Sequence, residues 1–449
     1  MKTVSLQFGS QQIQFKVPDS TDIFSAPKAK PLPKPEKAIQ KSLNSPIASA
    51  PLYNLTKNCK SAAVVVSDNT RPVPYKGPHG ILPPILKTLK QGGIKDIKII
   101  VACGTHRPVE ETKLKDILGD LAFQDGIRVI NHIATDQSVL RSIGSTDRSS
   151  EVSVNRYYLD ADLKIVTGLV EPHFVVGFSG GRKAICPGIC GEKVTYGFHS
   201  ADILNDPDST SLILEGNPCH EESLSIAKMA GVDFIVNVTI DSKKRITGIF
   251  SGELEQAHLA AVRYVRDFTT TELKRLYDIV ITVGGDVGIN HYQCAKAVFE
   301  SSRAVKPKGK IVLLGNLTDY DPVGGENYKK MLRLLTSLGH KAFLQTISTD
   351  DWIFIPEQWQ VQMWSKAFEK LGSTKKLFIC APQLQSYTDK LIPETNISSQ
   401  IKRLTGETDI GFTQRMMQQT IDTQLSASPD SSSLVLPDGP YAVPVITDG

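Results

Sequence analysis

Four short segments of the chain hold most of the residues that could take part in chemistry. They are SDNTRPVP at 67–74, ACGTHRP at 102–108, EPHFVVGFSGGRKAICPGICG at 171–191 and GGDVGINHYQCAKA at 284–297. Each follows a short apolar run of the kind that predicts a buried strand. Open α/β sheets bind ligands where their strands end, so we expect these segments to line a site.

The first two segments offer an anion-binding arginine and a proton-transferring histidine. In the first, Asp68 and Arg71 would project from the loop, and an arginine there suits a carboxylate or a phosphate. The alternative is a turn closed by the Asp side chain, with the Arg exposed. In the second, the imidazole of His106 could serve as a general acid or base, or could belong to an ordinary surface loop.

The third segment is the densest. His173 lies ten residues before Lys183, among five glycines that permit close backbone approach. Its Gly-Gly-Arg-Lys run resembles a phosphate cradle, but the spacing matches neither a nucleotide P-loop nor a dinucleotide fingerprint. A lysine held among backbone amides could instead be a covalent attachment point or an amine with a lowered pKa. His199 follows sixteen residues later, near enough to return to the same cavity.

The fourth segment predicts the start of a helix that carries Tyr292, Gln293 and Lys296 on its first turns. Tyr292 and Lys296 are four residues apart and would share one face. That face could bring a hydroxyl and a cation to a cleft between domains. The alternative is an ordinary amphipathic helix start.

The elements that must position these residues indicate an α/β fold. Short apolar strands separated by longer amphipathic stretches are typical of buried parallel sheets flanked by helices. We therefore expect two domains with mostly parallel sheets and an active site in the interdomain cleft. The predicted strands are 62–66, 97–101, 163–166, 234–238, 279–283, 311–314 and 377–380.

A boundary is expected at 269–275, where a helix at 254–265 gives way to a polar stretch and then to a new strand. This predicts an N-terminal domain over 1–271 and a C-terminal domain over 272–449, with a tail at 426–449 that could pack on either. Further expectations are a hairpin at 4–17, an extended surface arm over 25–51, and helices at 326–338 and 357–371.

Composition limits the classes of function. The 449 residues carry 51 Lys and Arg against 47 Asp and Glu, a slight basic excess that argues against a nucleic-acid binder. No run is long and apolar enough for a signal peptide or a spanning helix, which predicts a cytoplasmic protein with no membrane partner. The seven cysteines are odd in number and scattered, which favours a reducing compartment. Cys186 and Cys190 would need two more ligands to hold zinc, so packing is the favoured interpretation.

Taken together, the segments resemble the LarA family of nickel-pincer lactate racemases. The resemblance runs from about Leu6 to the terminal DGPYAVP, and its most specific part is the string EPH, GFSGGRK and PG. That family uses a nickel-pincer nucleotide, pyridinium-3,5-bisthiocarboxylic acid mononucleotide nickel. The resemblance therefore implies a small 2-hydroxy acid substrate and, as partners, the proteins that synthesise the cofactor.

The resemblance also implies roles for individual residues. His106 and His173 match the pair that acts on the substrate hydroxyl, Lys183 the covalent cofactor tether, and His199 the protein ligand to nickel. Arg71 and Lys296 match substrate-binding positions. The remaining matches are to positions near the cofactor: Asp68, Ser179, Gly180, Gly181, Tyr292, Gln293 and Trp359.

The implied reaction agrees with the residues present. Proton removal from C2 beside a carboxylate is difficult, whereas hydride transfer to an electrophilic cofactor carbon gives a planar 2-oxo acid. Return of the hydride to the other face inverts C2, and two histidines on opposite sides exchange the hydroxyl proton. HFVV and CGEKVTYGFHS depart from the lactate-specific pattern, so malate, aryl-lactate and sugar acids remain open as substrates. The same residues would also allow a metal hydrolase or lyase built on three histidines, or a protein that only binds a cofactor or a hydroxy acid.

Overall fold

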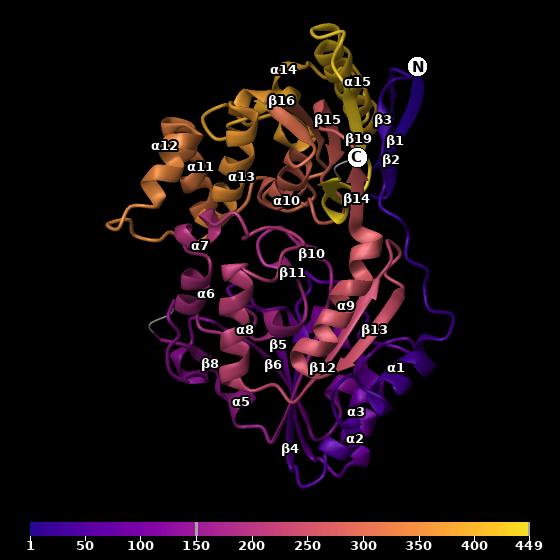
Figure 1. The fold of residues 1–449 in the computed structure, drawn as a ribbon, viewed down its shortest axis with the longest axis vertical. Helices are drawn as coiled ribbons and strands as arrows, with labels where there is room; N and C mark the ends of the chain where they lie inside the picture. The colour runs from indigo at the N-terminus through magenta and orange to yellow at the C-terminus, as the bar shows by residue number, and fades with distance from the viewer. Residues whose placement is uncertain (149–150, 448–449) are drawn as a thin grey trace. The chain divides into compact units, whose positions relative to one another are not determined.

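The computed structural model describes residues 1–148 and 151–447 and divides the chain into two compact units. One unit is continuous and spans Lys28–Phe268. The other combines Met1–Pro27 with Thr269–Gly449. Each unit contains its own six-stranded sheet with helices packed on it (Figure 1). Among the described residues, no helix is both long and apolar enough to cross a membrane.

The sheet of the continuous unit has the strand order β13-β12-β9-β4-β5-β6. All neighbouring pairs are parallel except β12 with β13. After β4, the chain adds β5 and β6 on one side of that strand. It then adds β9 on the other side of β4, so the direction in which strands are added to the sheet reverses between β4 and β9. The strands are β4 (Ser61–Ser67), β5 (Asp96–Ala102), β6 (Ile127–Asn131), β9 (Leu163–Leu169), β12 (Phe234–Ile240) and β13 (Ile246–Gly252).

Helices cover both faces of this sheet, which is why its central strands are apolar at nearly every position. On one face, the apolar sides of α1, α3 and α4 share a core with alternate strand residues such as Val64 and Ile99. The other face carries the short 3-10 turn η3, and α8 packs on η3. The bounds are α1 (Pro35–Asn44), α3 (Leu82–Gln91), α4 (Glu111–Leu118), η3 (Gly181–Ala184), α6 (Glu192–Phe198), α7 (Ala201–Asn205), α8 (Pro218–Ala230) and α9 (Leu254–Thr269).

The sheet of the second unit is parallel throughout, with the order β18-β17-β16-β15-β19-β3. Helices α10 and α13 pack against its central strands. A separate parallel pair joins β14 (Thr270–Leu273) to β20 (Val443–Ile446). The other elements are β3 (Asp22–Ile23), β15 (Tyr277–Val283), β16 (Val305–Leu314), β17 (Leu377–Cys380), β18 (Thr395–Asn396), β19 (Ser433–Leu436), α10 (His291–Ser302), α11 (Glu326–Leu338), α12 (His340–Ile347), α13 (Gln358–Leu371) and α15 (Asp409–Ser426).

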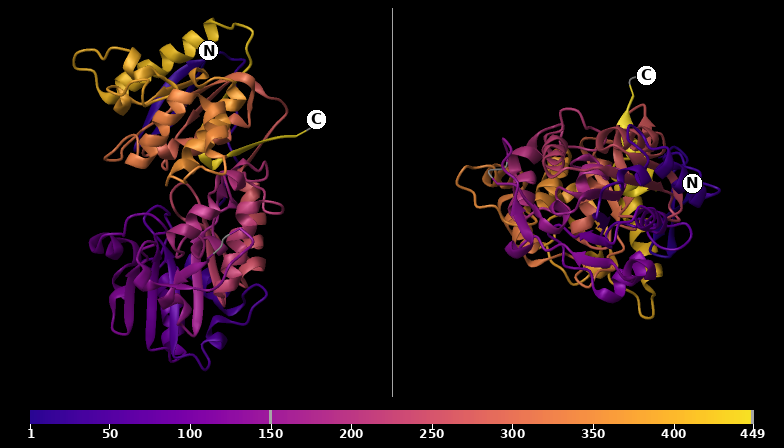
Figure 2. Two further views of the ribbon diagram at one scale, coloured as in Figure 1. Left: turned by 90° about the vertical axis from the view of Figure 1, so that its left-hand side faces the viewer. Right: turned by 90° about the horizontal axis from the view of Figure 1, so that it is seen from below.

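The N-terminal hairpin belongs to this second unit. Strands β1 (Lys2–Phe8) and β2 (Gln11–Val17) alternate buried apolar and exposed polar residues, as a strand with one buried face should. Their apolar side chains share a core with β15, β17 and α15. Figure 2 shows the indigo hairpin beside the yellow α15, and the two elements are in contact.

All seven predicted strands, the hairpin and the two named helices of the second unit are present. The division of the chain differs from the expected one, because residues 1–27 pack with the C-terminal unit rather than with 28–271. The tail also packs there, through β19 and β20; its last two residues lie outside the described part. The prediction of an extended arm over 25–51 was wrong for part of that stretch, since α1 forms at Pro35–Asn44 and buries Ile39 and Leu43.

Candidate active site

The order of strands in the continuous unit reverses between β4 and β9. Where neighbouring strands send their connections to opposite faces of an open sheet, a crevice opens at their carboxyl ends. The loop after β4 carries Asp68 and Arg71, the loop after β9 leads to His173 and Lys183, and the loop after β5 carries His106. Three of the four predicted segments therefore meet at one edge of one sheet.

Asp68 and His106 form a hydrogen-bonded pair across two of these loops. His106 Nδ1 lies 2.7 Å from Asp68 Oδ2, and Asp68 Oδ1 accepts hydrogen bonds from Thr70 N and Thr70 Oγ1 at 3.0 and 2.6 Å. Burial alone would raise the pKa of Asp68, but the hydrogen bonds from His106 and Thr70 outweigh it and lower that pKa. An ionised carboxylate only accepts, so Nδ1 of His106 carries a proton, and in the neutral form of this ring Nε2 presents the lone pair. The His106 side chain is 57% exposed, which suits a base that must reach a substrate.

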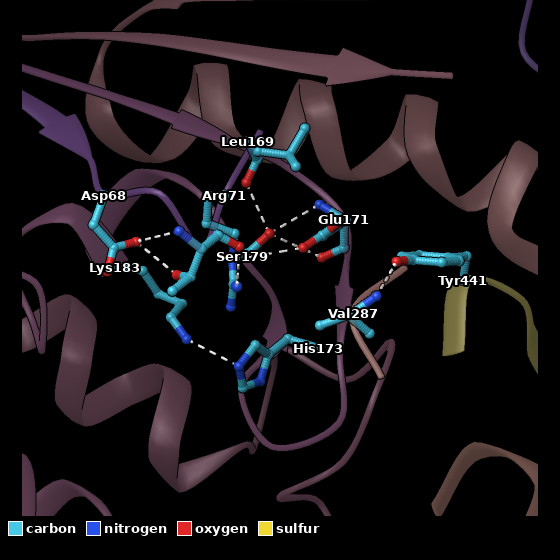
Figure 3. A network of polar contacts seen from close by, with 10 residues as sticks. Asp68, Arg71, Leu169, Glu171, His173, Ser179, Lys183, Val287 and Tyr441 are labelled. Carbon is cyan, nitrogen blue, oxygen red and sulfur yellow. Dashed lines mark hydrogen bonds and ion pairs between the residues drawn. The ribbon is translucent and has the colours of Figure 1, made fainter. Parts of the chain in front are cut away.

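His173 and Lys183 form a second pair, and Figure 3 shows their side chains pointing toward each other. Lys183 Nζ lies 3.0 Å from His173 Nε2. The backbone N–H groups of Val175 and Val176 point at His173 Nδ1 from 3.3 and 3.4 Å, which orients the ring so that Nε2 faces the lysine. The structure thus brings the predicted second histidine and the predicted tether together.

The glycine-rich turn between these residues is held mainly by contacts within the protein. Gly180 has a φ of +79°, and a Cβ there would lie 2.6 Å from Val170 Cγ2 and 2.9 Å from Asn237 Oδ1. The N–H of Gly181 donates to the same Asn237 Oδ1 at 3.1 Å. The buried hydroxyl of Ser179 donates to the Leu169 carbonyl at 2.7 Å. Tight packing therefore explains much of the glycine content of this turn. From the sequence, these glycines were expected to allow close approach of a ligand.

Arg182 is a further residue of this turn whose role the sequence did not indicate. It is fully buried, and its guanidinium donates to the Val176 carbonyl at 2.8 Å and lies 3.1 Å from His258 Nε2. Burial lowers the pKa of Arg182 to about 9. The His258 ring also donates to the Ser179 carbonyl at 2.9 Å. Arg182 and His258 therefore bond to carbonyl groups of the segment that contains Lys183 and help to hold its conformation.

His199 has the tautomer of a metal ligand. It lies at the end of α6, and its Nδ1 is 2.8 Å from the Thr195 carbonyl. A carbonyl only accepts, so Nδ1 carries the proton and Nε2 presents its lone pair. Burial lowers the pKa of His199 to about 3, with a further contribution from the positive charge of Lys183, so the ring is neutral near pH 7.

Protein side chains alone do not form a complete metal site in the described part of the chain. There, no three His, Cys, Asp or Glu side chains are grouped so that they could hold a metal ion. This does not favour the alternative of a hydrolase built on three histidines. A metal held by His199 would need its other ligands from a bound cofactor, which fits a nucleotide that supplies its own sulfur donors. Six of the seven cysteines are buried, in agreement with a packing role.

The fourth predicted segment lies in the second unit, at the corresponding strand-order reversal between β15 and β19. Tyr292, Gln293 and Lys296 lie in the first turns of α10, as predicted. Trp359 Nε1 donates to the Tyr292 hydroxyl at 2.8 Å, so two of the expected cofactor-binding residues contact each other. Burial raises the pKa of Tyr292, which keeps the phenol protonated. The Asn290 side chain accepts from Gln293 N at 2.9 Å and caps the helix.

Comparison with known proteins decides the family. A family model described as the lactate racemase N-terminal domain matches residues 8–211. The lactate racemase of Lactiplantibacillus plantarum is 32% identical over 335 residues, which cover 74% of this chain and 77% of that protein. This chain belongs to the lactate racemase family. The family assignment drawn from the four segments is thereby confirmed.

Two further comparisons support the membership. The lactate racemase of Thermoanaerobacterium thermosaccharolyticum is 29% identical over 370 residues, covering 81% of this chain and 85% of that protein. A structure of lactate racemase apoprotein from that organism matches with a TM-score of 0.84 and 26% identity, over 99% of this chain and 100% of the other. A Thermotoga maritima protein with 16% identity shares the fold, with a TM-score of 0.66, over 94% of this chain and 100% of the other. The predicted α/β fold class is confirmed as that of lactate racemase family members.

Proposed function

We propose that this lactate racemase family member inverts C2 of lactate by transferring hydride to and from a nickel-pincer nucleotide. The observation that carries the proposal is the presence of two histidine pairs at one sheet edge, His106 with Asp68 and His173 with Lys183. A racemase that passes through a planar 2-oxo acid needs two groups that can exchange the hydroxyl proton. The names of the relatives, both lactate racemases, make lactate the leading substrate.

In this proposal, the chain's own residues bind the substrate and move its proton. The guanidinium of Arg71 holds the carboxylate, with Lys296 as a second cation. His106 takes the hydroxyl proton at Nε2, and the carboxylate of Asp68 stabilises the imidazolium that results. His173 performs the same exchange for the opposite enantiomer. For each histidine, the direction of proton transfer depends on which enantiomer enters.

The cofactor would be held by residues of the first, third and fourth segments, together with His199 and Trp359. Lys183 would form the covalent tether, and the neutral imidazole of His199 would ligate nickel. When bound, the cofactor supplies an electrophilic carbon that accepts the C2 hydride and returns it. Asp68, with the backbone of 179–181, would lie close to it, as would a second set of residues: Tyr292, Gln293 and Trp359. We also propose that the chain acts in the cytoplasm, where the cofactor-synthesising proteins would supply the cofactor.

Intact-protein mass measurement tests the covalent cofactor. The chain is produced together with the cofactor-synthesising enzymes, and the wild type is expected to carry an added mass that Lys183→Ala lacks. Lys193→Ala, on α6 in the same unit, is the matched control and should retain the adduct. A wild type without added mass would contradict the proposed attachment.

Chiral chromatography tests the reaction itself. The cofactor-loaded protein is incubated with a single enantiomer of lactate, and we expect both enantiomers to appear. If lactate stays unchanged while another 2-hydroxy acid is inverted, the proposed substrate is wrong and the reaction type stands.

A further inference from the structure

Glu171 lies next to the arginine that is expected to bind the substrate carboxylate. Its Oε1 is 3.6 Å from Arg71 Nε, and both side chains are partly exposed. Figure 3 shows this acid bonded to Ser179, in the same close-up as the separate pair of His173 and Lys183. Glu171 begins the EPH motif and precedes His173 by two residues, but the sequence alone predicts no role for it.

The position of Glu171 is fixed by its backbone. Its N–H donates to Ser179 Oγ at 3.0 Å, and its carbonyl accepts from Ser179 N at 2.9 Å. The same serine hydroxyl bonds to the Leu169 carbonyl, at the end of β9. The backbone that carries this carboxylate is therefore held in place by its hydrogen bonds to Ser179.

Arg71 is held from two sides. Its Nη1 donates to the Thr70 carbonyl at 3.1 Å, while its Nε faces Glu171. A substrate carboxylate that binds the remaining N–H groups comes close to the negative charge of Glu171. Asp68, on the same loop, is a second carboxylate, and it is paired with His106.

The effect of this negative charge depends on the charge of the substrate. A hydroxy acid with one carboxylate experiences one repulsion, which its contact with Arg71 offsets. A dicarboxylate such as malate experiences a second repulsion, and the proposed function already assigns both cations, Arg71 and Lys296, to the first carboxylate. Repulsion between like charges is a common means by which a site rejects the wrong ligand.

We propose that Glu171 restricts this enzyme to 2-hydroxy acids with a single carboxylate by repelling a second one. This inference rests on the proposed function and narrows its substrate class. Glu171 acts through charge and takes no part in the proton or hydride transfer.

The test compares lactate and malate in Glu171→Gln, which keeps the shape of the side chain and removes its charge. For the cofactor-loaded wild type, we expect a lower kcat/KM with malate than with lactate. In the variant, the ratio of kcat/KM for malate to that for lactate should rise about tenfold, because one Coulomb repulsion has been removed for the second carboxylate. Glu255→Gln, which removes a carboxylate from the ion pair between Lys228 on α8 and Glu255 on α9, should leave the ratio unchanged.

A second measurement separates this inference from the proposed reaction. Ligand-detected NMR titration of the cofactor-free protein with each acid gives the ratio of affinities without turnover. Glu171→Gln should shift this ratio toward malate as well. Ratios that stay within twofold of the wild type, or a wild type that racemises malate as well as lactate, overturn the inference. A loaded wild type that racemises neither acid refutes the proposed function, and the NMR ratio then still decides the role of Glu171.

Discussion

Replacing Asp68 with asparagine should disable His106 as a base without disturbing the fold. Asp68 Oδ1 accepts two hydrogen bonds from Thr70, so the amide oxygen of asparagine is expected to stay on that side. The amide NH₂ then takes the place of Oδ2 and donates to His106 Nδ1 across the 2.7 Å contact. The neutral ring must carry its proton on Nε2 instead, and the lone pair that should receive the hydroxyl proton is lost.

The expected loss follows from the value of a positioned base. General-base catalysis contributes about 10²- to 10⁴-fold. Because His106 is more than half exposed and solvent screens its interaction with Asp68, we expect the lower end of that range. A fall of about 100-fold in kcat corresponds to about 2.7 kcal/mol of transition-state stabilisation. KM should change little, since Arg71 still binds the carboxylate.

The assay is kcat for lactate racemisation by chiral chromatography, with cofactor loading checked by intact mass. Asp162→Asn is the matched control, because that carboxylate accepts bonds from Lys60 and Ser61 at the start of β4 and contacts no histidine in the described structure. The control should keep its kcat within about twofold. A fully loaded Asp68→Asn enzyme that retains a third or more of the wild-type kcat would refute the tautomer argument.

Two further predictions concern stability. Ile39→Ala, in α1, should lower the free energy of unfolding by about 2–5 kcal/mol in urea titrations, because the removed atoms leave a cavity at a fully buried position. Lys37→Ala, on the exposed face of the same helix, is the control. Equal effects of the two substitutions would mean that α1 does not pack on the sheet. Burial lowers the pKa of His132 from 6.5 to about 4, so between these values the unfolded chain binds a proton that the folded chain excludes. Stability should therefore rise with pH across that window, and lowering the pH from 7 to 5 should cost about 2 kcal/mol through this residue. Urea titrations of His132→Gln should show a correspondingly smaller difference between the two pH values, and an unchanged difference would contradict this.

The strands and the loops that follow them were predictable because the sheets are buried on both faces. The run AAVVV is apolar at every position and IKIIV has a single polar residue, and the segments that could take part in chemistry come directly after them. A local pattern could not show which distant partners these residues meet. The contact of Glu171 with Arg71 joins residues a hundred positions apart, and the burial of Arg182 depends on the carbonyls of its own folded turn.

Helix α1 shows a local signal that the composition obscured. The stretch is rich in proline and lysine, yet Pro35 occupies the first helical turn, and Ile39 and Leu43 are four residues apart. The assignment of residues 1–27 had no such signal. Their apolar alternation predicts a hairpin with one buried face, and it contains nothing to indicate that α15, four hundred residues later, covers that face.

The contact between the hairpin and α15 affects the order in which the two units can fold during synthesis. During synthesis the hairpin leaves the ribosome before the whole of Lys28–Phe268, whereas the strands and the helix that bury it follow that unit. The unit at Lys28–Phe268 is continuous and can complete its sheet in the meantime, since domains generally fold as units from the N-terminus. The apolar side of the hairpin therefore lacks its native partners while that unit is being made, and its contact with α15 forms only after Ser426 has been added.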